Sequence, residues 1–227
     1  MTGPNGEPAS RPYRKSTARE YFESICIAVI LALFVRTFVV QAFKIPTGSM
    51  ENNLLIGDHL LVNKFVFAPT LTAAERTLLP IDPVERGDII VFKYPEDPER
   101  DFIKRVVGLP GETIEVKNKK VYINSQPLDE PYVHFMFPPE ERGPDEGPSF
   151  DFDVRSSYGP VTVPDGHFFM MGDNRDNSQD SRYWGFLPGS YVKGKALFVY
   201  FSFGEPRPGL GGVFSSIRWN RILHQIH

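Results

Sequence analysis

The sequence predicts a mostly β fold: an antiparallel β-rich domain that follows one N-terminal transmembrane helix. Two observations lead to this prediction. Residues 25–40 are almost all apolar, whereas from residue 43 onward the apolar residues form short runs broken by turn residues. Glycine (19 residues) and proline (21 residues) are frequent in the 227-residue chain. This is typical of short strands joined by many turns rather than of a helical bundle.

The apolar segment near the N-terminus is long enough for a membrane span. Residues 25–35 are all apolar, Arg36 and Thr37 break this apolar run, and the run resumes at Phe38. The core alone is shorter than the roughly 20 residues that a spanning helix needs. We therefore place the anchor at residues 20–40, where Arg36 lies near one end and its long side chain can reach the membrane interface.

Basic residues before the segment indicate its orientation. They are Arg11, Arg14, Lys15 and Arg19. Segments next to a membrane span that are rich in lysine and arginine tend to remain in the cytoplasm. We therefore expect residues 1–19 to be a cytoplasmic tail. Residues 41–227 would then form the domain outside a cytoplasmic membrane that the chain crosses once. Two alternatives remain open: a cleaved signal peptide, with small residues near Ala42, and a buried core helix, which a segment apolar all round fits poorly.

Beyond residue 43 the expected elements are strands. We predict them at residues 88–94 (closed by Pro95), 102–107, 113–117, 120–123, 161–163, 167–171 and 195–203. Asn118-Lys119 between two of these runs is a good hairpin turn. Residues 130–160 are rich in proline, glycine and charge, which indicates a variable excursion or a small subdomain. The tail at 214–223 mixes aromatic, apolar and basic residues, a pattern that fits a membrane surface or packing on its own domain.

Composition narrows the function classes. A net charge of −3 implies no strong attraction to nucleic acid, and we expect no nucleic-acid partner. The single cysteine, Cys26, lies in the apolar segment, so no disulfide within the chain and no cysteine metal cluster can form. We expect neither a metal site nor a cofactor.

Three blocks carry candidate chemistry: IPTGSM at 45–50, FIKRVVGLPG at 102–111 and MGDNRDNSQDSRYWG at 171–185. A serine hydroxyl needs a base to take its proton, and the chain has no Gly-x-Ser-x-Gly motif that would pair a serine with one of its five histidines. A lysine can serve if burial keeps it neutral. Lys104 lies in an apolar run, yet a lone strand lysine is most often solvated, and a serine after glycine is most often a turn residue or helix cap.

In this order the three blocks resemble those of type I signal peptidases, and the resemblance runs from about residue 20 to 203. It implies a membrane-bound serine endopeptidase that removes N-terminal signal peptides from exported preproteins and requires small residues before the cut. Its partners would be secretory preproteins and the lipid bilayer.

The resemblance also implies individual roles. Ser49 would be the nucleophile and Lys104 the general base, while Thr47 and the N–H of Ser49 would form the oxyanion hole. Ser178 would bond Lys104 and fix its rotamer, and two ion pairs, Arg105–Asp173 and Asp180–Arg182, would shape the site. The substrate pockets would be formed by Phe43, Ile45, Leu54, Val91, Asp101, Phe102 and Ile103.

Other functions remain possible at this point. A mitochondrial inner-membrane relative would have the same chemistry at a different location. A self-cleaving Ser-Lys repressor would need a DNA-binding domain where the apolar segment lies. A membrane-tethered binding module with a dead site is the alternative from a different class, and the intact Ser49 and Lys104 argue against it.

Overall fold

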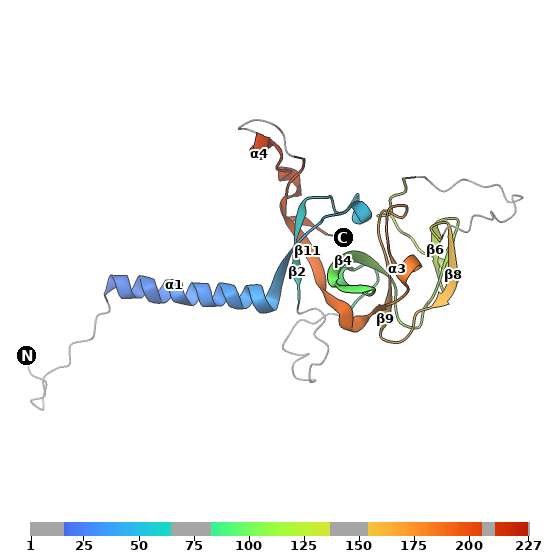
Figure 1. Ribbon diagram of the computed structural model, residues 1–227, viewed down its shortest axis with the longest axis horizontal. Helices are drawn as coiled ribbons and strands as arrows, with labels where there is room; N and C mark the ends of the chain where they lie inside the picture. The colour runs from blue at the N-terminus through green and yellow to red at the C-terminus, as the bar shows by residue number, and fades with distance from the viewer. Residues whose placement is uncertain (1–15, 65–82, 137–153, 206–211, 227) are drawn as a thin grey trace, which may run out of the picture. The chain divides into compact units, whose positions relative to one another are not determined.

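The computed structural model describes residues 16–64, 83–136, 154–205 and 212–226. The chain divides into two compact units, Met1–Val39 and Val40–His227, which we describe separately. The fold is an antiparallel β-rich domain together with one N-terminal apolar helix, which confirms the predicted fold class. Figure 1 shows the course of the chain.

The first unit contains α1 (Thr17–Phe34), which passes into a π-helical turn, η1 (Val35–Val39). The side chain of Ser16 caps the first turn by accepting a hydrogen bond from the N–H of Arg19. Together the two helices give 23 residues with a mean hydropathy of 2.2. At 1.5 Å per residue this is about 35 Å, enough to cross the hydrocarbon core of a bilayer. The helix begins three residues before the predicted anchor, and Val40 already belongs to the first strand.

The second unit contains an eight-stranded antiparallel sheet in the order β1-β2-β11-β3-β4-β9-β10, with β12 paired to β11. Its strands are β1 (Val40–Lys44), β2 (Asp58–Asn63), β3 (Ile89–Tyr94), β4 (Asp97–Gly108), β9 (His167–Met171), β10 (Leu187–Pro188), β11 (Val192–Ser202) and β12 (His224–Gln225). The short helical turns are η2 (Gly48–Met50), α3 (Ser181–Trp184), η4 (Gly189–Tyr191), α4 (Gly212–Ser215) and η5 (Trp219–Arg221).

A smaller sheet has the order β7-β6-β5-β8. Its strands are β5 (Thr113–Lys117), β6 (Lys120–Ile123), β7 (Gln126–Pro127) and β8 (Ser157–Thr162). The predicted hairpin is confirmed: β5 pairs with β6, and Asn118 and Lys119 both have positive φ, as a two-residue hairpin turn requires. In Figure 1, β6 and β8 lie together, apart from β2 and β11 of the large sheet.

Apolar clusters join these layers. Ile45, Met50 and Leu54 pack against strands β2, β3 and β11 and fix the segment that follows β1. A second cluster combines Val107 and Phe169 of the large sheet with β5 and β6 of the small one. The two sheets of this unit therefore share buried surface, which is the main source of stability in such packing.

Several boundaries differ from the predictions. The strand predicted at 102–107 is part of β4, which extends back to Asp97. Strands β1 and β2 were not predicted. Strand β1 directly continues the apolar run of the helix, so the sequence shows no change of pattern where this strand begins. Of the predicted excursion at 130–160, residues 137–153 lie outside the described residues, Glu130 and His134 contact the 173–175 loop, and 157–160 belong to β8.

Candidate active site

Two strands of the large sheet bring Ser49 and Lys104 together. Ser49 lies in the 3-10 turn η2, shortly after β1, and Lys104 lies within β4. The chain leaves β1 in a fixed direction, because the N–H of Ile45 donates to the carbonyl of Asp58 and the N–H of Gly57 donates to the carbonyl of Ile45. Met50, next to Ser49, is fully buried and anchors the turn in the core.

The side chains of Ser49 and Lys104 are in direct contact. Lys104 Nζ lies 2.7 Å from Ser49 Oγ and donates a second hydrogen bond, 3.0 Å long, to the carbonyl of Ile103. Lys104 is 4% exposed and Ser49 7% exposed. The distance is within the range over which a base can take a proton.

Burial changes the protonation of this lysine. It lowers the pKa of Lys104 from 10.5 to about 8, although Asp180 and Asp173 act in the opposite direction by favouring the charged form. At pH 8 the neutral fraction therefore rises from about 0.3% for an ordinary lysine to about half. The site thus holds a lysine that can act as a base near neutral pH.

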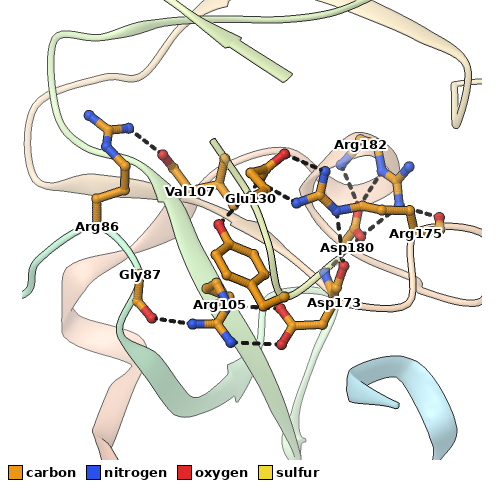
Figure 2. A network of polar contacts seen from close by, with 11 residues as sticks. Arg86, Gly87, Arg105, Val107, Glu130, Asp173, Arg175, Asp180 and Arg182 are labelled. Carbon is orange, nitrogen blue, oxygen red and sulfur yellow. Dashed lines mark hydrogen bonds and ion pairs between the residues drawn. The ribbon is translucent and has the colours of Figure 1, made fainter. Parts of the chain in front are cut away.

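The two carboxylates that act on Lys104, Asp173 and Asp180, each belong to a buried ion pair, and Figure 2 shows both pairs. Arg105 donates to both oxygens of Asp173, at 2.8 and 2.7 Å, and to the carbonyl of Gly87. Arg182 likewise donates to both oxygens of Asp180, at 2.9 Å each. Burial alone would raise the pKa of Asp180, but Arg182 holds it below its usual value. The structure therefore brings together both pairs expected from the sequence.

Ser178 is placed differently from what was expected. Its Oγ is buried and helps to lower the pKa of Asp180, whereas the hydrogen bonds of Lys104 Nζ in the described residues go to Ser49 Oγ and the carbonyl of Ile103, so the contact expected between Ser178 and Lys104 is not formed. Ser178 instead packs against Gly172. A Cβ at Gly172 would lie 2.3 Å from Ser178 Oγ and 2.5 Å from the carbonyl oxygen of Ser49, so only glycine allows this close approach.

A cavity of about 350 Å³ opens at the Ser49–Lys104 contact. It is lined by Phe43, Pro46, Thr47, Ser49, Arg100, Asp101, Phe102, Ile103, Lys104, Asn177 and Gln179. The predicted substrate residues thus separate into two groups. Phe43, Asp101, Phe102 and Ile103 line this cavity, whereas the other three, Ile45, Leu54 and Val91, lie in the apolar core and do not line it.

Four lining residues were not identified from the sequence: Pro46, Arg100, Asn177 and Gln179. Asn177 and Gln179 carried no local sequence signal, because residues 177–180 are all polar; only the structure shows that these two side chains are exposed while those of Ser178 and Asp180 are buried. Arg100 was missed because it lies in the extension of β4 that the sequence did not predict.

Two strand edges flank the cavity. Strand β1 pairs only with β2 in the described ladders, and Phe43 belongs to it. Strand β4 pairs with β3 along 101–105, but its pairing with β9 begins only at Arg105. The backbone of 101–103 therefore has one side outside the ladders of the described strands, and an extended peptide could pair there.

Comparisons with known proteins show the family of this chain. The family model described as signal peptidase, peptidase S26, matches residues 18–201. Signal peptidase I of Pseudomonas aeruginosa is 38% identical over 210 residues, covering 83% of this chain and 74% of its own. The probable signal peptidase I-1 of a Synechocystis strain is 40% identical over 213 residues, covering 91% and 93%. A crystal structure of a signal peptidase I from Enterococcus faecalis is 37% identical and covers 51% of this chain and 97% of its own, with a TM-score of 0.39.

Proposed function

We propose that this chain, which belongs to the peptidase S26 family of signal peptidases and is a signal peptidase I, cleaves preproteins with Ser49 as nucleophile and Lys104 as general base. One observation carries the proposal. A buried lysine whose neutral form is accessible near pH 8 lies 2.7 Å from the hydroxyl of a serine. That arrangement is what a serine needs to become a nucleophile without histidine.

The proposed reaction has two halves. Ser49 Oγ attacks the carbonyl carbon of the residue before the cut while neutral Lys104 takes the hydroxyl proton. When the C–N bond breaks, the Lys104 ammonium gives that proton to the leaving amine, which becomes the new N-terminus. Water then attacks the acyl ester with Lys104 again as the base. As the ester C–O bond breaks, the Lys104 ammonium gives that proton to Ser49 Oγ, and the signal peptide leaves as a carboxylic acid that loses its own proton to solvent.

The oxyanion of each tetrahedral intermediate would be bound at the start of η2. The first N–H groups of a helical turn have no partner within the turn, so the N–H of Ser49 is available as a donor. Thr47, which lines the cavity and is exposed, would supply its hydroxyl as the second donor. Such donors act mainly in the transition state.

Replacing Thr47 with valine is therefore expected to lower kcat by roughly 10²–10³ with little change in KM. Valine keeps the shape of the side chain and removes only the donor. Steady-state kinetics on a preprotein would measure both constants. An unchanged kcat would leave Thr47 as a turn residue without a part in the reaction.

We propose that the signal peptide lies extended between the edges of β1 and β4, with its last residues next to Ser49. Pro46, Ile103 and Lys104 line the cavity near the nucleophile, so a bulky side chain just before the cut would push the scissile carbonyl away from Ser49 Oγ. A displacement of about 1 Å can cost about 10² in rate.

The substrate test of this function uses one preprotein with alanine, leucine or phenylalanine immediately before the cut. We expect cleavage at the signal-peptide junction for alanine, located by mass spectrometry. The two large residues are expected to lower kcat/KM by about 10²-fold or more. Equal rates for all three would rule out the proposed small-residue requirement.

We propose that α1 is the membrane anchor, with the N-terminus in the cytoplasm and the β domain outside. Its large apolar side chains are exposed, and none is buried in the described residues of this helix. Phe214, Trp219 and Leu223 of the C-terminal tail are 64–72% exposed and would add contact with the bilayer. The basic residues before α1 support the orientation.

Deleting residues 1–39 is expected to remove most membrane binding and to leave cleavage of a short soluble peptide within a few-fold of the full chain. Cleavage of a membrane-bound preprotein should fall much more, because the anchor holds enzyme and substrate in one plane. Vesicle flotation and the two cleavage assays would measure this. Loss of activity on both substrates would mean that α1 is part of the catalytic fold.

A further inference from the structure

Residues 130–134, which we call the brace segment, follow β7 of the small sheet and contact the site from outside the three sequence motifs. The segment begins with a turn in which the N–H of Val133 donates to the carbonyl of Glu130, at 3.2 Å. None of its residues was assigned a role from the sequence.

The backbone of the brace segment pairs with the 173–175 loop, which in turn contacts the backbone of Ser49. The N–H of His134 donates to the carbonyl of Asp173 at 2.8 Å, and the N–H of Arg175 donates to the carbonyl of His134 at 3.0 Å. Between them, the N–H of Asn174 points the other way and donates to the carbonyl of Ser49 at 3.1 Å. The 173–175 backbone is thus held between the brace segment and Ser49.

A buried ion pair strengthens this contact (Figure 2). Both oxygens of Glu130 accept from the guanidinium of Arg175, with Nη1 at 3.0 Å. The Arg175 side chain is 2% exposed and that of Glu130 is 8% exposed. Arg175 Nε also donates to the carbonyl of Gly172 at 3.2 Å. Glu130 therefore fixes the arginine that closes the turn beside Ser49.

The brace segment also contacts the strand of the general base. The guanidinium carbon of Arg105, the neighbour of Lys104, lies 3.8 Å from the centre of the Tyr132 ring. The Tyr132 hydroxyl donates to Glu130 Oε1 at 3.1 Å, and burial raises its pKa, so it keeps its proton and remains a donor. The brace segment thus contacts Arg105, the neighbour of Lys104, and the 173–175 loop, which bonds the carbonyl of Ser49. We call Ser49 and Lys104 the dyad.

We infer that Glu130 and Tyr132 are positioning residues that set the distance between Ser49 Oγ and Lys104 Nζ, Glu130 through Arg175 and Tyr132 through Arg105. This inference rests on the proposed roles of Ser49 and Lys104. It means that the small sheet, from which the segment extends, contributes to the rate of the reaction and not only to the fold.

The test compares full-length variants in detergent on one preprotein. Glu130→Gln keeps the shape of the side chain and removes the charge that holds Arg175. We expect kcat to fall about tenfold or more, since even small misplacement of reacting groups is costly, with KM within about twofold. Tyr132→Leu should behave likewise, whereas Tyr132→Phe keeps the ring over Arg105 and should stay near wild type.

Glu112→Gln is the matched control. Glu112 accepts from Arg86 Nη2 at 2.5 Å and from the N–H of Leu109 at 2.7 Å, so the same chemical change breaks a similar arginine contact at a carboxylate that bonds neither Arg175 nor Arg105. Thermal unfolding is measured for every variant, and kinetics are taken well below each Tm. We expect Glu112→Gln to lower Tm with kcat unchanged.

The double variant Glu130→Gln with Arg175→Met tests whether the two residues act together. Its kcat should be no lower than that of the slower single variant, because both substitutions act through one contact.

Three results would overturn the inference: a folded Glu130→Gln protein with wild-type kcat, a Glu112→Gln protein that loses kcat equally, or Tyr132→Phe and Tyr132→Leu proteins with equal kcat. If Glu130→Gln does not fold, the two Tyr132 variants decide. Ser49→Ala in the same assay separates this inference from the proposed function. An inactive Ser49→Ala beside a fully active Glu130→Gln would reject only the positioning role, whereas an active Ser49→Ala would reject the dyad itself.

Discussion

Replacing Ser49 with alanine is expected to abolish cleavage, lowering kcat by about 10⁶-fold, the size of effect seen when a serine nucleophile is removed. The reason is that no acyl ester can form without Oγ, and Lys104 then has no hydroxyl to deprotonate. What remains is the contribution of binding and the oxyanion donors. Gel-based cleavage of a preprotein with a long incubation would detect the residual rate.

The same variant should fold normally. Ser49 is 7% exposed, and the change removes one oxygen atom without leaving a large cavity. We therefore expect a Tm close to that of the wild type and unchanged binding of a non-cleavable signal peptide. A well-folded variant that retains activity within about tenfold would show that another residue is the nucleophile.

Replacing Lys104 with arginine is expected to be nearly as damaging as removing Ser49, although the positive charge is kept. Arginine cannot lose its proton in a protein, so it cannot act as a base. Lys104→Met should be equally inactive because it keeps the length and has no amine. Single-turnover rates would compare the two. Substantial activity in the arginine variant would point to an electrostatic role for Lys104 instead of proton transfer.

Stability gives an independent check on the methionine variant. Burial lowers the pKa of Lys104 from its ordinary value of 10.5 to about 8 in the folded protein, so between these pH values the unfolded chain binds more protons than the folded chain. Burying this lysine therefore costs stability below pH 8, roughly 3 kcal/mol, and the cost disappears as the pH rises to about 10.5. Lys104→Met should be more stable than the wild type at pH 7, by an amount that shrinks across this range.

The sequence indicated the fold class, the hairpin at Asn118-Lys119 and the motifs that meet at the site, because these depend on local patterns. It could not separate pocket residues from core residues. Ile45 and Leu54 lie in the core and Phe102 lines the cavity, yet all three are apolar residues with the same local signature. That difference comes from how β1 and β4 are placed in the sheet.

The roles of Glu130 and Tyr132 had no sequence signal at all. They lie in a stretch rich in proline and charge, and their partners are 27 to 45 positions away: Arg105 for Tyr132, and Arg175 for Glu130. The pairing of His134 with the 173–175 loop brings Glu130 and Tyr132 next to the active site. Long-range pairing of irregular segments is the part of a fold that local pattern does not specify.

The most direct test of the proposed mechanism is the pKa of Lys104 itself. It can be measured by NMR titration of ¹⁵N-labelled lysine Nζ in the full-length Ser49→Ala protein, with Lys104→Met to assign the signal. The proposed base should titrate at about 8, and the acid limb of kcat/KM for the wild type should rise with pH through the same value. A titration near 10.5, or a rate that does not change with pH in this range, would contradict a neutral lysine as the base.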